Sequence, residues 1–190
     1  QRQDDLLDSA EDMEGVEMFF KAQRTVFDDA KKRLSSILKE RDYFAADADT
    51  LNVISTMSTI LAMPKPYSRI GELPELVQKV KTAYDGLLDM KREEVAENIR
   101  QCMQDVHQLA SEARDAGALL RQADDHFVNK REAAKTATSL TELDAMITQL
   151  LNYKDTICRR MEVMSASRQQ EAQKPTPAAT AKPGTPAPKP

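Results

Sequence analysis

Apolar residues recur every three or four positions along most of the chain, which is the period of an amphipathic helix. The first stripe predicts a helix over residues 13–41, with charged residues on the opposite face. Its members are Val16, Phe19, Phe20, Gln23, Val26, Phe27, Ala30, Leu34, Ile37 and Leu38. Residues 1–12 are polar, and we expect a frayed N-terminus there.

A second stripe, made of Leu51, Ile54, Met57 and Leu61, predicts a helix over residues 47–62. The segment 52–59 is rich in Ser, Thr and β-branched residues, which leaves a strand as an alternative. Such a strand would have no partner elsewhere in the sequence. The segment 63–71 then breaks the pattern, because its two prolines remove backbone donors and disfavour helix before them.

A third helix is predicted to open at Pro74, since proline is well tolerated in the first turn. No strong stop follows for about 60 residues, so an unbroken element would be about 90 Å long at 1.5 Å per residue. We expect a bend near residues 89–93 or at Gly117.

The last helix is predicted at residues 140–164, opened by a capping box in which Ser139 and Glu142 satisfy each other's free N–H groups. Its return from a much longer helix predicts an antiparallel pair. Residues 174–190 hold six of the nine prolines, so residues 165–190 are predicted to form a disordered Pro/Ala/Lys tail. The predicted fold class is therefore all-α: an elongated antiparallel helical bundle, over residues 13–164, with one very long helix and this tail.

Composition narrows the class of function. The net charge is −4, with acids and bases interspersed, whereas domains held on nucleic acid by charge are usually clearly basic. Cys102 and Cys158 are too few for a disulfide framework or a four-ligand zinc site, and both fall on apolar stripes. We expect buried thiols in a reducing, cytoplasmic compartment. No apolar run approaches the length of a membrane span, so no membrane partner is expected.

The chain offers no recognisable reaction chemistry. It has no Gly-rich phosphate loop and no His-Glu-x-x-His pair, so we predict no catalytic, cofactor-binding or metal-binding residue. The run Asp124-Asp125-His126 contains metal-ligand residue types. Consecutive helical residues point in different directions, however, and a solvated face is the favoured interpretation.

Two sets of side chains are candidates for binding. Phe19, Phe20 and Tyr67 are predicted to bind a protein partner, because aromatic anchors often dominate interfaces. A weaker candidate for nucleic-acid contact, against a plain solvated face, comprises Lys130, Arg131, Lys135, Arg159 and Arg160. Self-association as a coiled coil is a further alternative, so a homo-oligomer is possible.

Four stretches carry a family resemblance. They are DMEGVEMFFKAQ at 12–23 with Val-Phe-Asp at 26–28, MPKPYSRIGELP at 63–74, QCM at 101–103 and SLTEL at 139–143. Together they resemble the C-terminal helical region of BrxC, the large P-loop ATPase of the bacterial BREX phage-defence system, over about residues 12–164. The chain begins Gln-Arg-Gln without an initiating Met, and we expect a fragment or a processed chain.

The resemblance implies membership of a multi-protein assembly that blocks phage replication and works with a DNA methyltransferase. It also implies an ATPase motor, using ATP and Mg²⁺, upstream of this segment. This sequence lacks a Walker motif, so no nucleotide-binding residue carries over. The predicted function is a non-catalytic helical protein-interaction module, whose partners are other subunits of the defence complex or the parent ATPase body.

Overall fold

The computed structural model describes residues 2–175, 184 and 187–189, with the backbone alone for residues 2–12, Tyr67 and Arg168. Much of the predicted tail, at 176–183, 185–186 and 190, lies outside the described residues.

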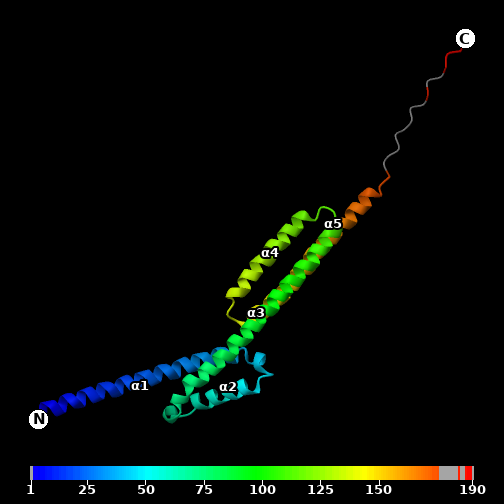
Figure 1. Cartoon of the computed structure of the whole chain (residues 1–190). Helices are drawn as coiled ribbons and strands as arrows, with labels where there is room; N and C mark the ends of the chain where they lie inside the picture. The colour runs from blue at the N-terminus through cyan, green and yellow to red at the C-terminus, as the bar shows by residue number, and fades with distance from the viewer. Residues whose placement is uncertain (1, 176–183, 185–186, 190) are drawn as a thin grey trace. The chain divides into compact units, whose positions relative to one another are not determined.

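The described part of the chain is helical and contains no strand (Figure 1). The predicted all-α helical bundle is therefore confirmed, and the strand alternative for residues 52–59 is wrong. The α-helices are α1 (Arg2–Leu38), α2 (Ala48–Leu61), α3 (Leu73–Glu112), α4 (Gly117–Thr136) and α5 (Leu140–Ala172). Three short 3₁₀ turns are η1 (Arg41–Phe44), η2 (Pro66–Ser68) and η3 (Ile70–Glu72).

The chain divides into two compact units. The first comprises residues 1–97 and 132–147, and the second comprises residues 98–131 and 148–190. Helices α3, α4 and α5 each contribute residues to both units.

The core of the first unit is built by α1, α2 and the start of α3. Its buried members are Ala30, Leu34, Ile37, Phe44, Ile54, Met57, Ile60, Leu73 and Val80. Helix α2 begins where expected because Asp47 caps it, accepting a hydrogen bond from the Thr50 N–H at 3.1 Å. Of the apolar face predicted for α2, Ile54 and Met57 are buried, whereas Leu51 and Leu61 are half-buried.

The end of α1 is tied to the start of α5 through one carboxylate, that of Glu40. The Leu140 N–H donates to Glu40 Oε2 at 3.1 Å, and the Ser139 hydroxyl donates to Oε1 at 3.0 Å. The Tyr84 hydroxyl of α3 lies 3.2 Å from Glu40 Oε2, and burial raises the pKa of Tyr84. The Glu142 N–H donates to Ser139 Oγ at 3.3 Å, as the capping-box pattern predicts.

In the second unit the chain reverses direction. The helix predicted to run about 60 residues from Pro74 ends instead at Glu112, and α4 folds back beside α3 (Figure 1). Asp115, in the connection, has a φ of 61°, a left-handed conformation that aspartate tolerates better than most residues. His107 Nε2 of α3 meets Asp124 Oδ1 of α4 at 2.7 Å. The bend expected near Gly117 is thus a complete reversal.

The reversal also changes how α5 packs. Lys130 Nζ donates to Gln149 Oε1 at 3.2 Å, and the rings of His126 and Tyr153 stack with their centroids 3.6 Å apart. These pairs make α4 and α5 antiparallel. Since α3 and α4 are also antiparallel, α3 and α5 run in the same direction in this unit. The predicted antiparallel pairing of the last helix with the long helix therefore holds for α4, the second half of that predicted helix, and not for α3.

Two helices extend further than the sequence pattern predicts. Helix α1 begins at Arg2 rather than near residue 13, and α5 continues to Ala172 rather than stopping at residue 164. Residues 165–172 lack the apolar stripe but are rich in Ala, Gln, Glu and Arg, which favour helix on propensity alone. The prediction of a tail from residue 165 is corrected over this segment.

Cys102 is buried and Cys158 is half-buried, and burial raises the pKa of both thiols.

In the described part of the chain, no helix combines the length and the apolar character that crossing a bilayer requires.

Candidate protein-interaction site

One line of positions, spaced alternately three and four residues apart, follows α1 for most of its length. We call it the α1 seam; it consists of Met13, Val16, Phe20, Gln23, Phe27, Ala30, Leu34 and Ile37. This spacing keeps all eight side chains on one face of a helix.

The α1 seam is covered along only half of its length. Ala30 and Ile37 are 1% and 3% exposed, because α2 and the neighbouring turns pack against them. Met13 and Phe20 are 74% and 54% exposed. Every residue from 13 to 22 is exposed. An apolar face that continues beyond its own core is typical of a surface meant for another chain.

The two phenylalanines predicted to bind a partner lie on this exposed stretch. Phe19 is 58% exposed, and its ring lies edge-to-face against that of Phe20, with the centroids 6.1 Å apart. The pair offers a large apolar area at low cost in side-chain entropy, since each ring has only two rotatable bonds.

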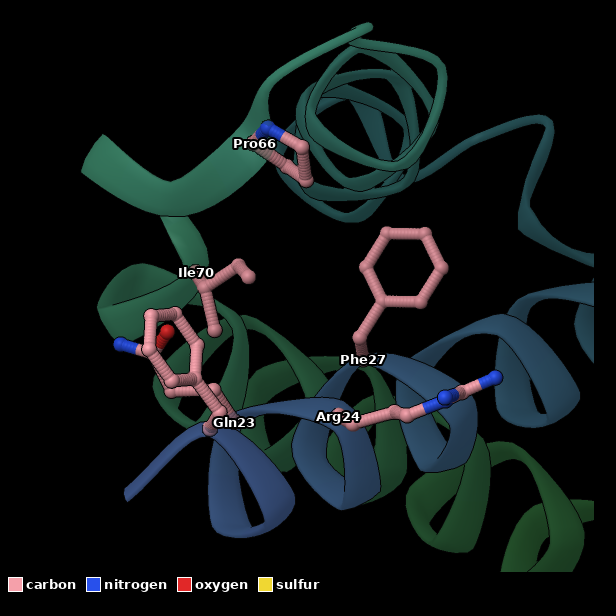
Figure 2. Close-up of a pocket in the computed structure, with 6 residues that line it drawn as sticks. Gln23, Arg24, Phe27, Pro66 and Ile70 are labelled. Atoms are coloured by element: carbon pink, nitrogen blue, oxygen red, sulfur yellow. The ribbon is translucent and has the colours of Figure 1, made fainter. Parts of the chain in front are cut away.

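A hollow of about 370 Å³ marks the point where the exposed and covered parts of the α1 seam meet. It is lined by Phe20, Gln23, Arg24, Phe27, Pro66 and Ile70. Figure 2 shows the Phe27 ring pointing from α1 toward Pro66, while Arg24 extends along the helix away from it. Ile70 is buried and closes the inner side of the hollow.

The third predicted anchor, Tyr67, belongs to the same neighbourhood. Its backbone lies in η2, directly after Pro66, whereas its side chain lies outside the described residues. The structure thus brings Phe20 and the turn that carries Tyr67 to one hollow. Sequence reasoning missed Phe27, Pro66 and Ile70 as lining residues. The alternating spacing of the seam was a signal for Phe27, but no local pattern places the 63–74 segment against α1.

The basic residues predicted for nucleic-acid contact are distributed over two helices. On α4, Lys130 donates to Gln149, and Lys135 pairs with Glu132 at 2.9 Å. Arg131 is exposed on the same helix. On α5, Arg159 and Arg160 line a hollow of about 470 Å³ with Leu119, Thr156, Val163 and Met164. Lys135 belongs to the first unit and the other four to the second.

The acidic run beside His126 is occupied by structural contacts. Asp124 pairs with His107, as described above, while the His126 ring stacks on Tyr153. Burial, and then the positive charge of Lys130, lower the pKa of His126. Across the part of the chain that the structure describes, no three His, Cys, Asp or Glu side chains are arranged to hold a metal ion.

Comparison with known families supports one part of the predicted resemblance. Residues 1–41 match the family model described as "BREX ATP-binding protein BrxC alpha helical domain", which covers α1 and the three residues after it. The first of the four resembling stretches lies inside this match, whereas the three from residue 63 onward lie outside it and stay predictions. No solved structure matches the chain. Over residues 1–41, the chain is therefore similar to the alpha helical domain of BrxC, the ATP-binding protein of BREX.

Proposed function

We propose that this chain is a non-catalytic, helical protein-interaction module of a BREX-type antiphage-defence ATPase, and that it helps to assemble the defence complex. One observation carries the proposal: within the segment matched to BrxC, the apolar seam of α1 continues for about three further turns, and every residue from 13 to 22 is exposed. The partner is another subunit of that complex or the body of the parent ATPase.

The chemistry of the segment agrees with a binding role. Its sequence has no phosphate-binding loop, so ATP and Mg²⁺ would be held by another part of the parent protein. The two hollows described above are lined by apolar side chains, three arginines, Gln23 and Thr156. We therefore assign this segment no step of the ATPase reaction.

The test is assembly of the complex with and without the exposed seam. The 190-residue chain, tagged, is co-expressed with the other proteins of a BREX system, and their co-purification is measured together with protection against phage in a plaque assay. Val16→Asp with Phe20→Asp should reduce both, because the charges would be buried at the interface. Helix content by circular dichroism should be unchanged, since both positions lie outside the core.

The matched control is Met90→Asp. Met90 is 67% exposed on α3, so it adds the same charge to an exposed apolar position away from the α1 seam. It should leave co-purification and protection intact. If the seam variant stays folded and assembles as well as the control does, the proposal fails.

DNA contact is a second hypothesis, supported by Arg159 and Arg160 at the rim of one hollow. If these arginines contact DNA phosphates, the chain should bind a DNA duplex less tightly as the salt concentration rises. A gel-shift titration of the chain at two salt concentrations, repeated with Arg159→Glu and Arg160→Glu, tests it.

A further inference from the structure

We propose that the exposed half of the α1 seam pairs with an amphipathic helix from another polypeptide, and that this partner helix carries basic residues beside its own apolar stripe. The inference rests on the proposed function and names the chemistry of the partner that the same face would take.

The α1 seam has the spacing of a helix that packs against another helix. Its residues occupy the a and d positions of a heptad repeat, the pattern by which two helices pack side by side. Met13, Phe20 and Leu34 are all a positions of a single register. Because the covered half already packs in this register, the exposed half presents a surface that is ready to receive one more helix.

The exposed half of the α1 seam is long enough for a partner helix to pack along it. Residues 13–23 span about 16 Å of helix axis at 1.5 Å per residue. The hollow beside Phe27, Pro66 and Ile70 lies at one end of this stretch. A partner helix lying along the seam would reach the first unit's own core at this hollow, where apolar side chains are available to cover its end.

The charges beside the α1 seam select the kind of partner helix. In residues 2–20 there are seven acidic residues against one basic residue. The e and g positions border the partner in a helix pair and set its choice. Arg24 occupies the e position beside the hollow, whereas by the sequence register Asp12 and Glu17 occupy the g and e positions of the exposed stretch. Lysine or arginine at the facing positions of the partner would pair with them.

The same charges disfavour the other occupants. A second copy in parallel would place Asp12 beside Glu17 of its neighbour, and an antiparallel copy centred on the exposed half would place Glu17 beside itself. Phosphates of nucleic acid and anionic lipid headgroups would find no attractive partner in the two carboxylates that border the seam. A basic amphipathic helix is the occupant that satisfies both the apolar seam and its flanks.

The experiment measures binding of the full 190-residue chain to two synthetic helices. Both have Leu at positions a and d over about four heptads; one has Lys and the other Glu at positions e and g. We expect the Lys peptide to bind roughly tenfold more tightly than the Glu peptide at low salt, and the preference to shrink as salt rises. Asp12→Lys with Glu17→Lys should reverse the preference.

The control reverses two acids elsewhere. Glu93→Lys with Glu162→Lys changes the net charge equally on exposed positions away from the α1 seam, and should keep the preference for the Lys peptide. Equal binding of both peptides would overturn the basic partner while leaving an apolar docking face, and so the proposed function, standing. Binding of neither peptide overturns the inference. So does a chain that dimerises by light scattering and becomes monomeric with Val16→Asp and Phe20→Asp, because the occupant is then a second copy.

Discussion

The two halves of α1 share one pattern and differ in what covers it. From Phe27 to Ile37 the seam faces α2, η3 and the start of α3, and its aliphatic members are buried. From Met13 to Gln23 the same spacing faces outward. A periodic apolar stripe therefore predicts a helix and its binding face, but not whether the face is covered by the same chain.

The halves should also differ in their source of stability. The covered half gains from burial of apolar area and from the Glu40 contacts that follow it. The exposed half has only its own backbone hydrogen bonds and side-chain propensities, which rarely hold a short helix in water. It therefore depends on the covered half, and on any partner, to remain ordered.

The largest expected effect contrasts the same heptad position in the two halves. Leu34→Ala should lower the free energy of unfolding by about 3 kcal/mol, because it leaves a cavity in a packed core. Met13→Ala should change it by less than about 0.5 kcal/mol, as is usual for exposed positions. Urea unfolding followed by circular dichroism measures both. Equal effects at the two positions would mean that the exposed half is covered in solution.

The second contrast concerns the acids. Glu40→Ala should cost about 2 kcal/mol of unfolding free energy, because it removes the acceptor of the Ser139 hydroxyl and leaves the Leu140 N–H only its longer hydrogen bond, at 3.3 Å, to the Tyr84 hydroxyl. Tyr84→Phe, which removes one member of the same cluster, should cost about 1 kcal/mol. Glu14→Ala, on the exposed half of α1, should be close to neutral. A Glu40 variant as stable as the Glu14 variant would show that the carboxylate does not hold α5.

Much of the fold could be predicted from local sequence pattern. The features that could not be predicted depend on contacts between residues far apart in the sequence. Helix α2 and the capping serine at Ser139 were predictable because the determinants lie within a few residues of each other. The reversal at Asp115 was not, since aspartate also fits a helix surface and only tertiary packing selects its left-handed conformation. The role of Glu40 was equally hidden, because its partners lie 44, 99 and 100 positions away.

The candidate site was predictable in part for the same reason. Phe19 and Phe20 were identified because aromatic anchors often dominate interfaces. The exposure itself was not decided by the sequence: the stripe through Val16 and Phe20 is as regular as that through Ala30 and Leu34, which is buried. The hollow required the contact between α1 and the 63–74 segment, which is a long-range feature that no periodicity reports.

The third contrast uses two glycines in open helical positions. An added Cβ meets nothing within 4 Å at either Gly15 or Gly86, so alanine should stabilise each local helix by about 1 kcal/mol. Gly86 lies in α3, which is packed, and Gly86→Ala should raise the global free energy of unfolding. Gly15→Ala should instead slow hydrogen exchange around residues 13–22 without moving the global transition, because that half unfolds locally. A global shift from Gly15→Ala would contradict the contrast.

The smallest expected effect lies in the ion network that fixes the start of α5 in the first unit. Asp144 accepts from Lys91 Nζ at 2.9 Å and from the Tyr43 hydroxyl at 3.0 Å. The hydrogen bond from Lys91, followed by that from Tyr43, holds the pKa of Asp144 below its usual value. The contribution is present above the unfolded pKa of about 4 and disappears as the pH falls through the lower folded value.

Asp144→Asn should therefore cost about 0.5 kcal/mol at neutral pH, a small figure because the pair is partly exposed and screened by solvent. The difference between the variant and the wild type should close as urea unfolding is repeated at pH values falling below about 4. Glu17→Gln, on the exposed half of α1, supplies the control and should not alter stability at neutral pH. If the difference in unfolding free energy between Asp144→Asn and the wild type instead grows as the pH falls, the folded state disfavours the ionised carboxylate. The Lys91 contact would then not outweigh its desolvation, and the packed part of the first unit would owe its stability to apolar burial and the Glu40 cluster.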